Sequence, residues 1–179
     1  MIKALFLDRD GIINEDKGYI YKAEQVTFTE GIFRFMKTAA SLGFELFVVT
    51  NQSGLARGMY QQADVLELHK WMNKELEKED ISIRKFYICP HHPSLTGRCE
   101  CRKPESGMFK AAEKEFDIDM NSSVMIGDKK SDVQAGKNAG VAFNILVKSK
   151  YASEPLPEAD FFAADLHEAE QALRNYCEA

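Results

Sequence analysis

The stretch MIKALFLDRDG, residues 1–11, indicates the class of fold. Its apolar run from Ile2 to Leu7 is short and stops at acidic residues, as a buried strand does when polar groups follow it. Similar apolar runs lie at 44–50, 86–89, 123–127 and 141–147. Segments with helical periodicity separate or follow them, at 32–42, 65–79, 108–116, 131–138 and 165–176. Strands that alternate with helices predict parallel βαβ units in one doubly wound, Rossmann-like α/β sheet.

Length and composition limit the kind of protein. The chain has 179 residues, 45% hydrophobic and 28% charged, which is typical of one globular domain over residues 1–179. No apolar run approaches the ~20 residues of a membrane span, and the first is too short for a secretory signal, so we expect a cytoplasmic protein. The net charge of −5 argues against nucleic acid as a partner. We expect a monomer. We also expect no inserted cap domain, because the segments between the motifs are too short for one.

Three polar clusters follow predicted strands. They read Asp8-Arg9-Asp10-Gly11, Thr50-Asn51-Gln52-Ser53-Gly54 and Gly127-Asp128-Lys129. Ligands bind beyond the carboxyl ends of the strands in such sheets, so we expect the clusters to converge. Carboxylates from Asp8, Asp10 and Asp128 would suit Mg²⁺, and one of them could attack phosphorus to form an aspartyl-phosphate. Asp8 and Asp10 alone could merely end a strand and cap a turn, but the other two clusters favour the chemical interpretation.

A second candidate metal site lies in the loop at 89–103. Cys89, His91, Cys99 and Cys101 supply three thiolates and one imidazole, which would complete a closed tetrahedral zinc site. The alternative is a polar loop with free cysteines. A closed site leaves no open position for chemistry, so the predicted zinc is structural and would fix the loop that carries the residues after Cys101.

The polar clusters resemble the motifs of the haloacid dehalogenase-like phosphohydrolases along nearly the whole chain. Asp8-Arg9-Asp10-Gly11 is similar to the first motif, Thr50-Asn51 to the second, Lys103 to the third, and Gly127-Asp128 with Asp132 to the fourth. Within the superfamily, TNQSGLARG at 50–58 and CPHHP at 89–93 look most like the heptose 1,7-bisphosphate 7-phosphatase branch. Ile12 replaces the threonine that usually follows the glycine of the first motif.

The resemblance implies roles for the catalytic residues. Asp8 would be the nucleophile, and Asp10 the general acid and then the base. Mg²⁺ would bind the Asp8 side chain, the Asp10 backbone carbonyl and the Asp128 side chain. Thr50 and Lys103 would stabilise the phosphoryl group during its transfer.

The resemblance also implies a substrate and the residues that contact it. The reaction would remove the 7-phosphate of D-glycero-D-manno-heptose 1,7-bisphosphate, leaving heptose 1-phosphate for ADP- or GDP-heptose and lipopolysaccharide or related glycan synthesis. Histidinol-phosphate phosphatase and a non-catalytic, zinc-organised binding module are the alternatives. The implied substrate-binding residues are Asp16, Lys17, Gly18, Tyr19, Thr50, Asn51, Gln52, Ser53, Arg102, Lys103 and Lys129.

Two further residues have a structural interpretation. Asp132 is expected to orient the magnesium site rather than bind the ion. His69, on the helix predicted at 65–79, is expected at the surface or its boundary.

Overall fold

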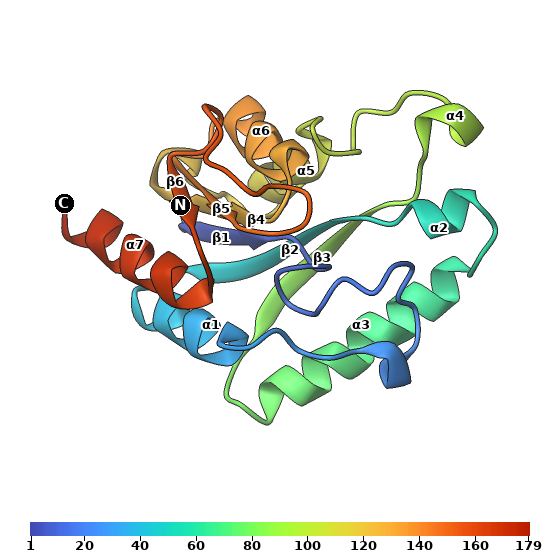
Figure 1. The fold of residues 1–179 in the computed structure, drawn as a ribbon, viewed down its shortest axis with the longest axis horizontal. Coiled ribbons are helices and arrows are strands. Elements are labelled where there is room, and N and C mark those ends of the chain that lie inside the picture. The colour runs from blue at the N-terminus through green and yellow to red at the C-terminus, as the bar shows by residue number, and fades with distance from the viewer.

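The computed structural model describes residues 1–179 and is built on one six-stranded sheet (Figure 1). Its strands are β1 (Ala4–Leu7), β2 (Glu45–Asn51), β3 (Ile83–Cys89), β4 (Val124–Gly127), β5 (Phe143–Val147) and β6 (Phe161–Ala163). All neighbours are parallel, in the order β3-β2-β1-β4-β5-β6. This confirms the predicted doubly wound α/β fold, and no cap domain is inserted between the strands.

Helices cover both faces of the sheet. They are α1 (Ile32–Ser41), α2 (Ser53–Ala56), α3 (Gln62–Glu77), α4 (Pro93–Thr96), α5 (Gly107–Phe116), α6 (Lys130–Ala139) and α7 (Leu166–Glu178). One core packs α1, α3 and α7 against the sheet, and a second packs α5 and α6 against the other face (Figure 1). Leu5 and Leu7 point into the first core, and Phe6 into the second, where its ring lies 4.8 Å from that of Phe109. Because both faces are covered, the strands have nearly continuous apolar sequences.

The element ends differ modestly from the sequence prediction. Strand β1 starts at Ala4, because Ile2 makes only an isolated bridge to Ile118. Strand β3 and helix α3 each begin three residues earlier than predicted, at Ile83 and Gln62. The short elements β6, α2 and α4 were not predicted, since three or four residues are too few to show a period. None of the helices combines the length and apolarity that crossing a bilayer requires.

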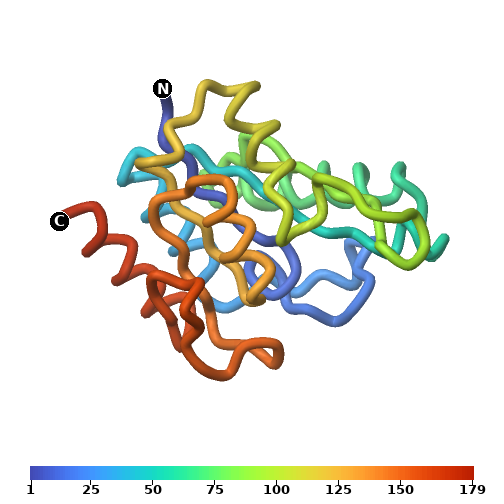
Figure 2. The backbone as a smooth tube through the Cα atoms, turned by 90° about the horizontal axis from the view of Figure 1, so that it is seen from above, coloured from blue at the N-terminus to red at the C-terminus, as the bar shows by residue number.

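The topology determines where a ligand can bind. The chain order reverses between β1 and β4, which are neighbours in the sheet, and ligand sites in such folds lie at this switch point. The segments that follow β1, β2 and β3 lie on the side of the molecule away from both termini (Figures 1 and 2). The polar clusters after the strands therefore meet at one edge of the sheet.

Candidate active site

A cluster of buried carboxylates occupies the switch point. Asp8 follows β1, Asp128 follows β4 and Asp132 lies in the first turn of α6; one ligand oxygen from each lies within 4.8 Å of the others. All three are at most 4% exposed. Gly11 lies against this cluster with φ of +93°, and a Cβ there would come within 2.2 Å of Asp128 Oδ2, so only glycine fits.

Lys103 is the cation at the centre of the cluster. Its Nζ lies 2.7 Å from Asp8 Oδ1, 2.7 Å from Asp132 Oδ1 and 2.7 Å from the Val49 carbonyl oxygen. Burial opposes the charge on Lys103, but the carboxylates of Asp132 and Asp8 hold its pKa above the usual value. Lys103 is therefore a protonated, positively charged partner of Asp8.

The cluster still lacks positive charge. Burial, and next the charge of Asp132, raises the pKa of Asp8 to about 7, despite the opposing charges of Lys103 and Lys129. Burial likewise raises the pKa of Asp128 to about 6. A divalent cation with oxygen ligands would favour the ionised form of both buried carboxylates and so oppose the effect of burial, and the residues present therefore fit Mg²⁺.

Asp132 holds the cluster together instead of offering free oxygens. Its Oδ2 accepts hydrogen bonds from the backbone N–H groups of Asp128 and Lys129, at 3.1 and 3.0 Å, while its Oδ1 pairs with Lys103. These contacts support the expectation that Asp132 orients the site.

Asp10 lies beside the carboxylate cluster in a cradle of donors. Its carboxylate accepts from Arg9 Nε and Nη2 at 3.0 and 3.1 Å, and from Asn14 Nδ2 at 3.0 Å. Gln52 Nε2 donates to it at 3.1 Å and also to Thr50 Oγ1 at 2.8 Å. The second motif therefore contacts the first through Gln52.

Asn51 connects the end of β2 to the third motif. Its side-chain amide donates to the Lys103 carbonyl at 3.2 Å and accepts from the Lys103 N–H at 3.0 Å. This paired contact fixes the backbone from which Lys103 reaches Asp8.

A polar cavity of about 390 Å³ opens over these groups. Most of the predicted site residues line it: Asp8, Asp10, Asp16, Gly18, Tyr19, Asn51, Gln52, Ser53, Arg102, Lys103 and Lys129. Lys17 and Thr50 are not among the lining residues, because Lys17 bonds Thr27 at the surface and Thr50 is 1% exposed. Asp128 lines an adjoining hollow of about 270 Å³.

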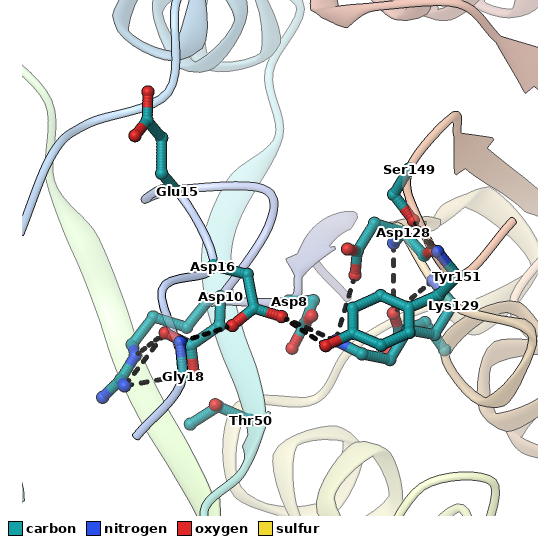
Figure 3. Close-up of polar contacts among 12 residues, drawn as sticks. Asp8, Asp10, Glu15, Asp16, Gly18, Thr50, Asp128, Lys129, Ser149 and Tyr151 are labelled. Carbon is teal, nitrogen blue, oxygen red and sulfur yellow. Dashed lines mark hydrogen bonds and ion pairs between the residues drawn. The ribbon is translucent and has the colours of Figure 1, made fainter. Parts of the chain in front are cut away.

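Three lining residues were missed by the sequence interpretation: Tyr60, Ser131 and Tyr151. Tyr151 donates to Asp16 Oδ2 at 2.9 Å, and Lys129 Nζ lies 4.4 Å from the centre of its ring (Figure 3). Lys129 also lies 3.8 Å from Asp16 and 3.4 Å from Asp128. The loops after β1 and β5 thus meet over the cavity, a pairing of distant segments that no local pattern indicates.

The cysteine and histidine side chains predicted to bind zinc also come together. Cys89 Sγ lies 3.7 Å from Cys99 Sγ and 3.0 Å from Cys101 Sγ, and His91 Nδ1 lies 3.4 Å from Cys101 Sγ. A zinc–sulfur bond of about 2.3 Å gives a tetrahedral edge of about 3.8 Å, so the donor set and its spacing fit zinc. None of these cysteines forms a disulfide.

The Cys89/His91/Cys99/Cys101 cluster is connected to the cavity through Arg102. The Arg102 N–H points to Cys99 Sγ at 3.4 Å, and its Nη1 donates to the His91 carbonyl at 3.3 Å. Lys103 follows directly. The cluster therefore anchors the backbone that presents two cavity-lining cations.

Comparisons with known proteins agree with this geometry. A family model described as HAD-hydrolase-like matches residues 100–169. The chain is 51% identical over 160 residues, 89% of its length and 88% of the relative's, to a D-glycero-alpha-D-manno-heptose-1,7-bisphosphate 7-phosphatase of Campylobacter jejuni. It is 42% identical over 153 residues, 83% of each chain, to a D-glycero-beta-D-manno-heptose-1,7-bisphosphate 7-phosphatase of Haemophilus influenzae.

A solved structure extends the likeness to the fold. A D,D-heptose 1,7-bisphosphate phosphatase from B. bronchiseptica, complexed with magnesium and phosphate, has a TM-score of 0.85 and 29% identity over 98% of this chain and 99% of that one. The chain belongs to the haloacid dehalogenase-like hydrolases, as one of their phosphatases.

Proposed function

We propose that the chain hydrolyses the 7-phosphate of D-glycero-D-manno-heptose 1,7-bisphosphate and leaves heptose 1-phosphate. The observation that carries this proposal is the convergence of Asp8, Asp128 and Lys103 beside a polar cavity with further cations at its wall. The relatives named above support the choice of substrate, because two of them carry this activity in their names. We propose that residues 1–179 act as one cytoplasmic, monomeric domain.

The side chains of Asp8 and Asp128, with the backbone carbonyl of Asp10, are proposed to hold Mg²⁺. When bound, the ion would neutralise charge on the carboxylates and the phosphoryl oxygens. Asp132 keeps both of its oxygens engaged with Lys103 and two backbone N–H groups, so it is assigned to orientation.

The chain's own residues would carry out two displacements. Asp8 attacks phosphorus while Lys103, 2.7 Å away, stabilises the negative charge of the transferring group. Asp10 gives a proton to the departing sugar oxygen, and Thr50 is assigned to the phosphoryl oxygens. Asp10 then takes a proton from the water that cleaves the aspartyl-phosphate and restores Asp8.

The cations at the cavity wall are proposed to bind the phosphate that is not cleaved. Arg102 suits this role because a guanidinium can bind two phosphate oxygens at once. Lys129 and the segment 16–19 face the same cavity, apart from the surface residue Lys17.

The substrate proposal is tested by kinetics of the purified protein on a panel of substrates. The panel contains both anomers of the heptose bisphosphate, fructose bisphosphate and histidinol phosphate, each with Mg²⁺ or with a chelator. We expect Mg²⁺-dependent preference for a heptose bisphosphate and a product that retains its anomeric phosphate by ³¹P NMR. Preference for histidinol phosphate would overturn the proposed assignment of heptose bisphosphate as the substrate. Asp8→Asn should abolish turnover, with Asp117→Asn, a change at an exposed carboxylate, as the matched control.

We propose that Cys89, His91, Cys99 and Cys101 bind a structural zinc ion. Cys99→Ser should lower the zinc content and the unfolding temperature, and reduce turnover through the loop that carries Arg102. Cys177→Ser is the matched control, because this exposed cysteine lies outside the cluster. A Cys99→Ser protein that is fully active and free of zinc would contradict the structural role.

A further inference from the structure

Arg9 lies between Asp8 and Asp10 in sequence but points into the protein interior. It is 0% exposed and is the largest fully buried side chain of the molecule. Its guanidinium donates hydrogen bonds to the Asp10 carboxylate through Nε and Nη2, and the same Nη2 donates to the carbonyl of Ile20 at 2.8 Å. Its remaining nitrogen, Nη1, lies 3.1 Å from His69 Nε2. The proposed function gives Arg9 no part, although it contacts the proposed acid and base.

His69 is a buried partner of this arginine and not a surface residue, so the prediction for it was wrong. It is 4% exposed, on α3, and its ring stacks on Phe86 with centroids 4.2 Å apart. Burial, and next the charge of Arg9, lowers the pKa of His69 to about 3. The ring is therefore neutral at the pH of a cell, and Arg9 does not face a second cation.

The contact fixes the tautomer of His69. Arginine nitrogens only donate, so His69 Nε2 must accept and its proton must reside on Nδ1. His69 Nδ1 is buried and has no hydrogen-bond partner. A buried donor without a partner costs stability, so the contact with Arg9 comes with an unpaired N–H at His69 Nδ1.

We propose that Arg9 and His69 form a buried positioning pair that holds the Asp10 carboxylate ready to accept a proton from water. Arg9 is the only basic side chain in an ion pair with Asp10, and a two-point guanidinium contact fixes the plane of a carboxylate as well as its position. His69 touches no reacting atom and acts through Arg9. The Asp10 side chain is 22% exposed and lines the cavity, so the pair connects the core to the reaction site.

The proposal rests on the proposed function and concerns its second displacement. There the water oxygen bonds to phosphorus, the bond between phosphorus and Asp8 breaks, and the water proton passes to Asp10. That proton leaves Asp10 with the sugar oxygen in the next turnover. The four N–H donations around Asp10 hold its carboxylate in a fixed orientation beside the cavity, which the second displacement requires.

Stopped-flow kinetics with 4-nitrophenyl phosphate and Mg²⁺ separates this role from a merely structural one. Nitrophenolate departs without a proton, so loss of the base should spare formation of the aspartyl-phosphate and slow its hydrolysis. We expect His69→Leu to show a burst of one equivalent of nitrophenolate, followed by turnover reduced on the order of tenfold or more, since a positioned base contributes about 100- to 10,000-fold. Arg9→Lys keeps the charge, loses the two-point contact, and should behave likewise.

Two further variants serve as controls. His69→Gln offers an acceptor oxygen near the place of Nε2 and should remove the burst and restore turnover. Phe86→Leu loses the ring stack but keeps the acceptor, so its unfolding temperature should fall without a burst. A burst in Phe86→Leu equal to that in His69→Leu would overturn the proposal, as would the absence of a burst in both His69→Leu and Arg9→Lys.

Asp10→Asn distinguishes failure of this inference from failure of the proposed function. It should itself show the burst, because a carboxamide cannot take the proton. If Asp10→Asn turns over normally, the proposed role of Asp10 is wrong. If Asp10→Asn shows the burst and the Arg9 and His69 variants do not, only the positioning pair is wrong.

Discussion

Replacing Lys103 with methionine tests the electrostatics of the carboxylate cluster. The change keeps most of the side-chain volume but removes the ammonium that lies 2.7 Å from both Asp8 and Asp132. Two carboxylates that are at most 4% exposed would then have lost their cation. Turnover should be lost, because the same ammonium is assigned to the transferring phosphoryl group.

The magnitude follows from burial and chain length. Breaking a buried ion pair by removing one partner costs about 3–5 kcal/mol. In a chain of this size 1 kcal/mol moves the unfolding midpoint by about 2–4 °C, so we expect a fall of roughly 10 °C at pH 8. The pKa of Asp8, already raised to about 7, should rise further without the lysine. A carboxyl group whose pKa is higher in the folded than in the unfolded protein stabilises the folded state at low pH, and this contribution is lost as the pH rises through the folded pKa. The loss of stability in Lys103→Met should therefore be smaller at pH 5.5 than at pH 8, by roughly half.

Thermal unfolding followed by circular dichroism, with chelator present, measures the fall in unfolding midpoint from wild type to Lys103→Met at pH 8 and at pH 5.5. Lys110→Met is the matched control: Lys110 forms an ion pair with Glu113 at 2.9 Å, but both side chains are at least 37% exposed. Exposed pairs contribute about 0–1 kcal/mol, so the control should lose little at either pH. A Lys103→Met midpoint within the range of the control at pH 8, or a larger deficit at pH 5.5 than at pH 8, would refute the reasoning.

Three other changes probe the same edge of the sheet. Gly11→Ala should weaken Mg²⁺ binding on the order of tenfold or more by calorimetry, since it adds backbone strain and displaces Asp128; unchanged affinity would contradict the close packing. Mg²⁺ affinity should rise from pH 5.5 to pH 8, because the ion must displace protons from Asp8 and Asp128, whose pKa values are raised to about 7 and about 6; a flat profile would argue against both as ligands. Tyr151→Phe removes the hydrogen bond to Asp16 but keeps the ring over Lys129, so KM for the bisphosphate should rise about two- to tenfold with kcat nearly unchanged. A selective loss of kcat would place Tyr151 in the chemistry instead.

Much of the fold could be predicted because its strands are buried on both faces. Continuous apolar runs such as 123–127 can be recognised without knowledge of their neighbours, and acidic or amide residues mark where they end. The convergence of Asp8 and Asp128 then follows from the parallel topology alone, and the structure places them together. The cysteine and histidine cluster was recognisable for a different reason, since its donors are close in sequence and of types that zinc prefers.

The remaining features depend on contacts between distant segments. His69 lies four residues after Val65 and three before Met72, so the helical period places it on the buried face of α3, and the surface prediction was wrong because it followed the polar side chain instead. Its contacts with Arg9 and Phe86 depend on tertiary packing and could not be predicted. Tyr151 is an exposed aromatic residue in a loop, and its role over the cavity comes from the approach of Asp16. Edge strand β6 is too short for any period to be visible.

The central claim is that Asp8 becomes phosphorylated during turnover. Asp10→Asn protein is mixed with Mg²⁺ and 4-nitrophenyl phosphate, whose leaving group needs no proton from Asp10, then quenched rapidly in acid and reduced with borohydride. It should yield a peptide in which Asp8 alone has become homoserine by mass spectrometry. Reduction of a different carboxylate, or wild-type turnover with no reducible acyl phosphate in either protein, would contradict the account.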